Sequence, residues 1–275
     1  MIKSGVWERV PAIAANGIEI YFERAGSGPR LLFISGTGGD LWIKPNVFDG
    51  PLPRSFDLLT YDQRGLGQSE KPDAPYSMAD YADDAAALMA AAGWDEALVI
   101  GVSFGGMVAQ ELALRHPERV KKLVLACTSP GWAGGSSFPF HEIEHLKVEA
   151  RARHMIPISD TRRTDDWARA HPDAYAQFVE MGSRDPFAEE PGHAMGAHRQ
   201  LEARARHDTW DRLPQIRCPV MIAAGRYDGI ALPETQERMA ARIPGAALQF
   251  FEGGHLFMIQ DRTATPAMAA FLLDG

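Results

Sequence analysis

The stretch that decides the fold is Gly101-Val102-Ser103-Phe104-Gly105-Gly106. The apolar run of residues 97–100 before it has the length and branching of a buried strand, and residues 107–114 after it have the apolar spacing of a helix. A serine between a strand and a helix, with glycines two residues on either side, is the sequence form of a nucleophile elbow. The glycines permit a tight, strained turn that pushes the hydroxyl out at the carboxyl end of the strand. We therefore expect Ser103 to be a nucleophile.

Strand patterns and helix patterns alternate on both sides of this elbow. Helix patterns cover residues 77–92, 104–116 and 233–242 and a last segment that ends near Leu273. Strand patterns cover residues 10–14, 18–24, 31–34, 56–61, 97–100, 122–126, 220–225 and 248–251, the first two joined by Asn16-Gly17 as a hairpin with a type I′ turn. The alternation predicts an α/β fold with a mostly parallel eight-stranded sheet and helices on both faces.

The alternation stops at Ser129 and resumes only with the strand pattern of residues 220–225. Residues 131–213 contain no clear strand, but they contain helical segments rich in arginine, histidine and aromatic residues. So long a segment is not expected to be a structureless loop. We expect it to be a helical cap over the sheet, inserted in a core domain of residues 1–130 and 214–275.

A serine nucleophile needs a base, and the base needs an orienting carboxylate. The order expected after an elbow serine is acid and then histidine. Asp228 follows the strand pattern of residues 220–225, and His255 follows that of residues 248–251. Parallel strands bring their carboxyl ends to one edge of a sheet, so Ser103, Asp228 and His255 are predicted to meet there as a catalytic triad.

The position after the strand pattern of residues 122–126 is another place where such an acid can stand. It holds Cys127, Thr128 and Ser129 and no carboxylate, which leaves Asp228 without a competitor.

An oxyanion hole is the remaining part that this chemistry requires. One donor is expected to be the backbone N–H of Phe104, the residue after the nucleophile. The second is expected from the glycine-rich loop that follows residues 31–34, where we assign Thr37, with Gly38 as the alternative. The glycines of this loop let the backbone approach a substrate oxygen closely.

The composition narrows the classes of partner. The chain has 275 residues, a net charge of -8 and 45% hydrophobic residues, as expected of a globular protein with a large core. The acidic balance argues against nucleic acid or an anionic membrane surface as a partner. No apolar run is long enough to span a bilayer and the first ten residues show no secretory signal, so we expect a cytoplasmic protein. Its oligomeric state is not indicated.

Two sequence features suggest a metal or a disulfide but are better explained otherwise. His141-Glu142-Ile143-Glu144-His145 matches the H-E-x-x-H pattern of zinc proteases. The charge of Glu144 and the place of the match in the insertion favour an exposed helical surface, so no metal site is expected. Cys127 and Cys218 are predicted to lie near opposite ends of the sheet as small buried side chains, too far apart for a disulfide.

Asp62-Gln63-Arg64-Gly65-Leu66-Gly67-Gln68-Ser69 matches the D-x-R-G-x-G-x-S loop of the α/β-hydrolase superfamily. The chain resembles that superfamily from the first hairpin to the last helix, and the three predicted triad residues fall on its triad positions. The resemblance implies that the insertion is a mobile cap lining the substrate pocket. Many members carry His-Gly where this chain has Ser35-Gly36, which is similar to the enol-lactonase and aminoacrylate-hydrolase branches. Dehalogenases and epoxide hydrolases of this fold use aspartate in place of Ser103, so those chemistries are not expected.

These observations predict a serine hydrolase that acts on a small, largely apolar ester or lactone without a cofactor. The same triad also serves carbon–carbon bond hydrolases, thioesterases and perhydrolases, so these remain alternatives. A catalytically weak ligand receptor of the same fold is an alternative of another class.

Overall fold

The computed structural model describes residues 12–185 and 188–274. Its strands are β1 Ile13–Ala15, β2 Ile18–Ile20, β3 Phe22–Ala25, β4 Arg30–Ile34, β5 Asp57–Tyr61, β6 Ala97–Val102, β7 Val120–Ala126, β8 Val220–Gly225 and β9 Ala247–Phe251. Its α-helices are α1 Met78–Ala91, α2 Phe104–Arg115, α3 Val148–Ser159, α4 Asp165–Ala170, α5 Pro172–Gly182, α6 His193–Ala205, α7 Pro233–Arg242, α8 Phe257–Gln260 and α9 Ala264–Leu273. Short 3-10 turns stand at Val47–Asp49, Leu52–Arg54, Pro117–Arg119, Trp132–Gly134, Phe140–Ile143 and Leu213–Gln215.

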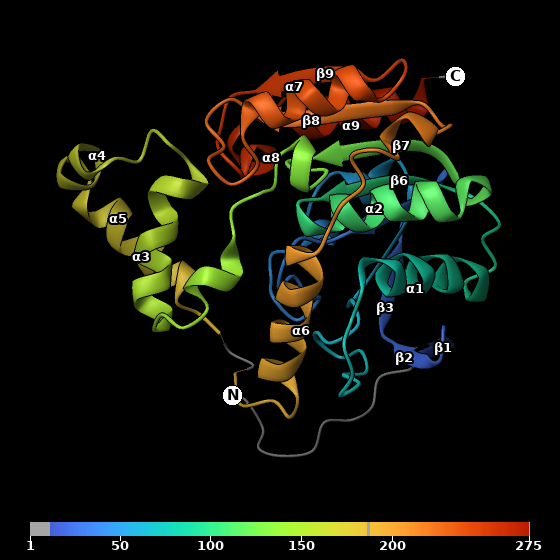
Figure 1. Ribbon diagram of the computed structural model, residues 1–275, viewed down its shortest axis with the longest axis horizontal. Coiled ribbons are helices and arrows are strands. Elements are labelled where there is room, and N and C mark those ends of the chain that lie inside the picture. The colour runs from blue at the N-terminus through green and yellow to red at the C-terminus, as the bar shows by residue number, and fades with distance from the viewer. Residues whose placement is uncertain (1–11, 186–187, 275) are drawn as a thin grey trace.

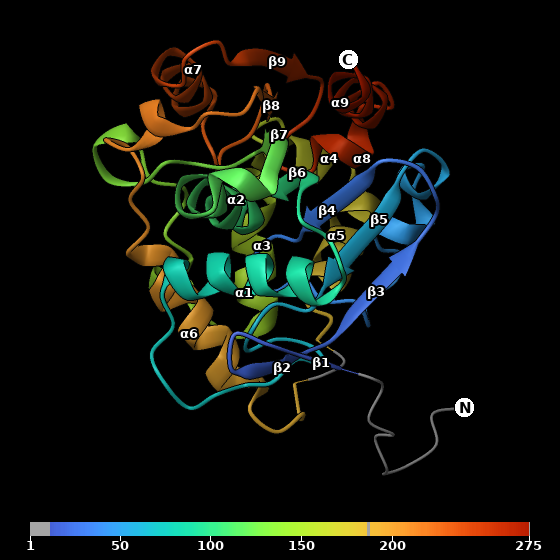
Figure 2. The same cartoon turned by 90° about the vertical axis from the view of Figure 1, so that its right-hand side faces the viewer.

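The central sheet has the order β3-β5-β4-β6-β7-β8-β9. Only β3 runs antiparallel to its neighbour, β5, and the other pairs are parallel. Helices α1, α2 and α7 pack on one face and α9 packs on the other, as Figure 2 shows for α7 and α9 on either side of β8 and β9. This arrangement confirms the predicted α/β fold class.

The sheet has one strand fewer, among the described residues, than the eight that the sequence predicts. The expected strand 18–24 is interrupted at Tyr21, whose N–H donates to Ser69 Oγ and whose carbonyl accepts from the N–H of Asp62. These bonds tie the chain to the loop after β5, so β2 stays with β1 in a separate hairpin while β3 joins the sheet. Asn16 and Gly17 both have positive φ, as a type I′ turn requires. Residues 10 and 11 of the predicted first strand lie outside the described residues.

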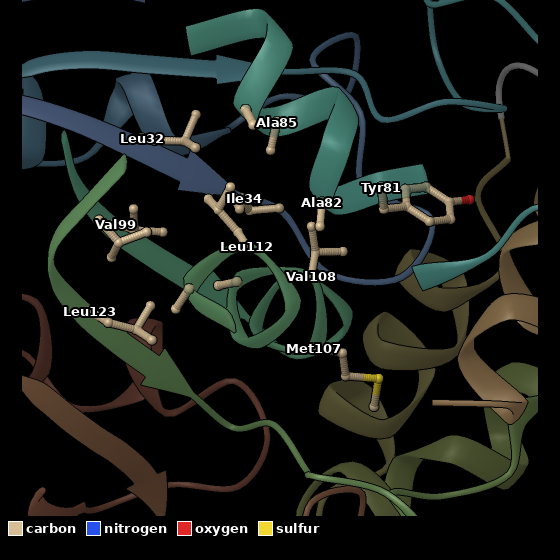
Figure 3. Packing of buried hydrophobic residues seen from close by; sticks show 14 of the residues in the cluster. Leu32, Ile34, Tyr81, Ala82, Ala85, Val99, Met107, Val108, Leu112 and Leu123 are labelled. Atoms are coloured by element: carbon tan, nitrogen blue, oxygen red, sulfur yellow. The ribbon is translucent and has the colours of Figure 1, made fainter. Parts of the chain in front are cut away.

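The buried side chains of the strands alternate between the two faces of the sheet. Leu32, Val99 and Leu123 point toward α1 and α2, where they meet Val108 and Leu112 (Figure 3). Their sequence neighbours, such as Leu31 and Leu98, belong to the cluster on the other face, under α9. Both faces are therefore covered, which explains why the strands are continuous apolar runs in the sequence.

Helices α3 to α6 occupy the segment between β7 and β8, and no strand is found in its described part. Helices α3, α4 and α5 form a group to one side of the sheet, and α6 runs separately from them (Figure 1). None of the helices in the described ranges is long and apolar enough to cross a membrane.

Candidate active site

Ser103 stands at the turn between β6 and α2, where the elbow was predicted. Its φ of 54° and ψ of -115° lie in a region that residues other than glycine rarely adopt. The turn is held by the Ser103 N–H, which donates to the Ala126 carbonyl at 2.8 Å, and by Thr128 Oγ1, which donates to the Ser103 carbonyl at 2.7 Å. The hydroxyl thus sits in a strained but well-supported position at the carboxyl edge of the sheet.

The glycines of the elbow are required by close backbone contact. A Cβ at Gly105 would lie 2.5 Å from the Ser35 carbonyl oxygen and closer still to that of Ile34. A Cβ at Gly101 would lie 2.7 Å from the Cβ of Ala109. Helix α2 therefore begins directly against the end of β4, which brings Ser103 next to the loop that follows β4.

His255 joins the nucleophile to a buried carboxylate. Its Nε2 lies 3.0 Å from Ser103 Oγ, and its Nδ1 lies 2.8 Å from Asp228 Oδ2. Asp228 is 1% exposed, and its Oδ1 accepts the N–H groups of Ile230 at 2.8 Å and Ala231 at 3.0 Å. These two amides leave Oδ2 free to face the imidazole. The structure thus brings together three side chains that stand 125 and 27 positions apart in sequence (228 − 103 and 255 − 228).

The glycine-rich loop after β4 lies beside the nucleophile. A Cβ at Gly36 would lie 3.4 Å from the Cβ of Ser103. The Gly38 N–H donates to Gln200 Oε1 of α6 at 2.8 Å, whereas the N–H groups of Thr37 and Phe104 have no acceptor among the described residues. Of the two residues that the sequence offered for this loop, Thr37 keeps its amide available and Gly38 does not.

Cys127 lies against the same histidine and carboxylate. Its sulfur, a carboxylate oxygen of Asp228 and a ring nitrogen of His255 lie within 4.8 Å of one another, the one cluster of possible metal ligands found in the described residues. Both nitrogens of His255 already take part in hydrogen bonds. Burial, and then the charge of Asp228, raise the pKa of the Cys127 thiol well above its ordinary value, so the thiol stays protonated. The three side chains therefore fit a hydrogen-bonded relay of Asp228 and His255 beside a neutral thiol better than they fit a metal site.

The inserted segment supports the loops that carry the acid and the histidine. The Ser159 carbonyl, at the end of α3, accepts the N–H of His255 at 2.6 Å. The Ile158 carbonyl accepts the N–H of Gly229 at 3.0 Å, next to Asp228. The end of α3 therefore fixes the backbone on both sides of the His255–Asp228 pair.

The H-E-x-x-H match does not lie on an α-helix. Residues Phe140–Ile143 form a short 3-10 turn, and α3 begins only at Val148. The i and i+4 positions of His141 and His145 thus lack the helical frame that a zinc-protease motif uses. Of the two cysteines, Cys127 is buried as predicted, whereas Cys218, just before β8, is only partly buried against the core.

Three polar residues that the sequence does not mark as buried, Gln200, Arg204 and His207, are buried in or next to α6. Arg204 is 7% exposed and forms no ion pair with any described residue. Burial lowers the pKa of His207 to about 3, which keeps the imidazole neutral. Gln200 and Arg204 are one helical turn apart, so they share a face of the helix. Polar residues on an exposed helix face have the same spacing, so the sequence does not indicate that these two are buried.

The chain is also similar in sequence to proteins of one known family. The alpha/beta hydrolase fold family matches residues 29–261. The chain belongs to this family. Its membership confirms the resemblance drawn from the elbow and the D-x-R-G-x-G-x-S loop.

Several relatives of the alpha/beta hydrolase family are similar to the chain over most of their length. A poly(3-hydroxyalkanoate) depolymerase of Ectopseudomonas oleovorans is 30% identical, over 88% of this chain and 83% of that protein. A putative carbamate hydrolase RutD of Caulobacter sp. is 30% identical, over 94% of this chain and 95% of that protein. The crystal structure of the enol-lactonase from Burkholderia xenovorans LB400 superposes with a TM-score of 0.78 at 25% identity, covering 96% and 100% of the two chains. These names support hydrolase activity for this chain.

Proposed function

We propose that the protein is a serine hydrolase that cleaves a carboxylic ester or lactone through an acyl-enzyme. The observation that carries the proposal is the unbroken relay from Ser103 Oγ to His255 at 3.0 Å and from His255 to Asp228 at 2.8 Å. The similarity to proteins named depolymerase and enol-lactonase supports the same class of substrate.

In the first half of the reaction, Ser103 Oγ attacks the substrate carbonyl carbon while His255 Nε2 takes the hydroxyl proton. The Asp228 carboxylate stabilises the resulting imidazolium. The carbonyl oxygen becomes an oxyanion, which accepts hydrogen bonds from the free N–H groups of Thr37 and Phe104. Loss of one such donor costs on the order of 100- to 1000-fold in turnover. His255 then gives its proton to the leaving alkoxide, and an ester of Ser103 remains.

In the second half, water replaces the alcohol. His255 Nε2 takes a proton from that water as its oxygen attacks the acyl-enzyme carbonyl, and the second tetrahedral oxyanion occupies the same two N–H groups. Collapse of this intermediate returns the proton from His255 to Ser103 Oγ and releases the carboxylic acid. Every proton in this cycle moves between substrate, water, Ser103 and His255, and Asp228 stays ionised throughout.

We also propose that residues 131–213 serve as the cap of this site and that the substrate is a small molecule that enters beneath it. The contacts of α3 with the loops of Asp228 and His255 support this role. So does the bond from Gly38 to Gln200 of α6, which ties the same segment to the loop of Thr37.

The experiment is a panel of p-nitrophenyl esters of graded acyl length together with lactones, measured on the wild type, Ser103→Ala and Ser27→Ala. Ser27 is an exposed serine before β4, at the opposite edge of the sheet, and serves as the matched control. We expect Ser103→Ala to lose at least about a thousandfold in kcat, and Ser27→Ala to lose nothing. A fluorophosphonate probe should label the wild type at Ser103 alone.

Residual hydrolysis by Ser103→Ala above a thousandth of the wild-type rate would contradict the assignment of the nucleophile. Turnover of thioesters or carbon–carbon substrates in preference to every ester would move the protein to another class with the same triad. A ligand that raises the melting temperature without any turnover would favour the receptor alternative.

A further inference from the structure

A cavity of about 230 Å³ lies between α2 and the inserted segment. It is far larger than the roughly 30 Å³ that one water molecule occupies in the liquid. Met107 and Ser129 line it from the core, and Phe138, Leu201 and Arg204 line it from residues 131–213. None of the lining residues among those that the structure describes carries a carboxylate.

Ser103 is not among the described residues that line the cavity, but two lining residues, Met107 and Ser129, lie near it. Met107 stands four positions after Ser103 in α2, one helical turn or roughly 6 Å along the axis. Ser129 directly follows Thr128, whose hydroxyl donates to the Ser103 carbonyl at 2.7 Å. In Figure 3 Met107 lies at the end of the core cluster, away from the strands that Val108 and Leu112 cover. An arm of a substrate that reaches past Met107 from Ser103 would enter this cavity.

Arg204 supplies an unpaired positive charge to the cavity wall. The side chain is 7% exposed, and its Nη2 donates to Ser137 Oγ at 2.6 Å. Its Nε and Nη1 find no acceptor within residues 12–185 and 188–274, and it forms no ion pair there. The guanidinium carbon lies 4.3 Å from the centroid of the Phe140 ring, which fixes the plane of the fork.

A buried guanidinium without a counter-ion is costly, and native proteins pair such groups. Burial lowers the pKa of Arg204 only to about 10, so the charge persists at neutral pH. His207, on the same cavity, is neutral there because burial lowers its pKa to about 3. Arg204 thus offers the cavity one positive charge and the unused N–H donors of Nε and Nη1. One positive charge balances a monoanionic carboxylate but leaves a dianionic phosphate with an uncompensated charge.

We infer that the cavity receives a carboxylate-bearing arm of the substrate and that Arg204 binds the carboxylate. The substrate class is then an ester or lactone whose apolar chain ends in a free carboxylate a few bonds from the scissile carbonyl. The inference rests on the proposed function for the reacting end of the substrate, but the binding of the carboxylate by Arg204 is separable from turnover.

The kinetic test compares mono-p-nitrophenyl adipate with p-nitrophenyl hexanoate, which has the same number of carbon atoms and ends in a methyl group. We expect the wild type to prefer the adipate ester in kcat/KM. Arg204→Met should lower the adipate-to-hexanoate ratio of kcat/KM about 10- to 100-fold, the usual worth of a charged hydrogen bond, mainly through KM. The matched control is Arg206→Met, the exposed arginine at the end of α6, which should leave the ratio unchanged.

The binding test uses free adipate and neutral adipamide with the catalytically inactive Ser103→Ala protein. Adipate should raise the melting temperature and adipamide should not, and Arg204→Met should abolish the difference. This comparison needs no turnover, so a shift with adipate in a protein that hydrolyses no ester would keep the carboxylate site and reject the proposed function. Equal use of both esters by the wild type, or equal shifts with adipate and adipamide, would overturn the inference. The ligand comparison in an otherwise intact chain stands even if Arg204→Met does not fold.

Discussion

Replacement of Asp228 by asparagine tests the relay with the smallest change of shape. In the structure, Oδ1 accepts two backbone N–H groups, from Ile230 and Ala231, while Oδ2 faces His255 Nδ1 at 2.8 Å. Only an oxygen can accept hydrogen bonds from those two backbone N–H groups. The asparagine Oδ1 therefore keeps both hydrogen bonds, and its Nδ2 must face the imidazole. An NH₂ group can only donate, so His255 Nδ1 has to accept and the ring proton moves to Nε2.

The relocated proton then points at Ser103 Oγ, 3.0 Å away, and Nε2 cannot take the proton of the hydroxyl. In a trypsin-like triad the same tautomer change lowers kcat by about 10⁴-fold. We expect a loss of that order for Asp228→Asn. Since the hydrogen bonds from both backbone N–H groups are kept, the free energy of unfolding should change by less than about 1 kcal/mol.

The assay is steady-state hydrolysis of the best ester from the panel, together with thermal unfolding of each variant. Asp228→Ala is the comparison, because it leaves the amides of Ile230 and Ala231 without their acceptor and should also destabilise the fold by roughly 1–3 kcal/mol. Retention of a tenth or more of the wild-type kcat by a folded Asp228→Asn protein would refute the reasoning. It would mean that something other than Asp228 sets the tautomer of His255.

Three further outcomes are expected. Gly105→Ala should destabilise the protein by about 2 kcal/mol or more, because the new Cβ meets backbone carbonyls that cannot move apart; an unchanged melting temperature would contradict this. The pKa of His207 is about 3 in the folded protein and 6.5 in the free side chain. Its contribution to stability is therefore present above pH 6.5 and is lost as the pH falls toward 3. The loss between pH 6.5 and pH 5 should be about 2 kcal/mol. Urea unfolding at pH 7.5 and pH 5 should show a smaller loss for His207→Gln than for the wild type, and equal losses would refute this. Cys127→Asp in the Asp228→Asn background should recover at least tenfold in kcat, because the sulfur lies within 4.8 Å of His255 and a carboxylate there can accept from the ring; no recovery would exclude that position as a second acid site.

Several features of this chain were predictable because local sequence determines them. The tight turn at Ser103 was predictable because the glycines beside it allow backbone groups to approach closely. The parallel sheet follows from apolar runs such as residues 97–100, whose neighbouring side chains are buried on opposite faces. The convergence of Asp228 and His255 near Ser103 follows from topology, since parallel strands end at one edge.

Other features depended on contacts between distant parts of the chain. The break at Tyr21, which keeps β2 out of the sheet, is made by hydrogen bonds to Asp62 and Ser69. The N–H of Gly38 donates to Gln200, more than 160 positions away, which is what favours Thr37 as the donor in the proposed oxyanion hole. No local pattern in residues 131–213 fixes which polar side chain turns inward.

The sequence by itself determined the α/β fold and the order of the residues in the candidate triad, because hydrophobic period and glycine sterics act over a few residues. Only the tertiary structure decided that Arg204 is buried on the cavity beside Met107 with no counter-ion in the described part of the chain. Burial and pairing of a charge depend on the packing of helices from separate parts of the chain, and a charged residue in an amphipathic segment has the same local pattern whether it faces water or a substrate.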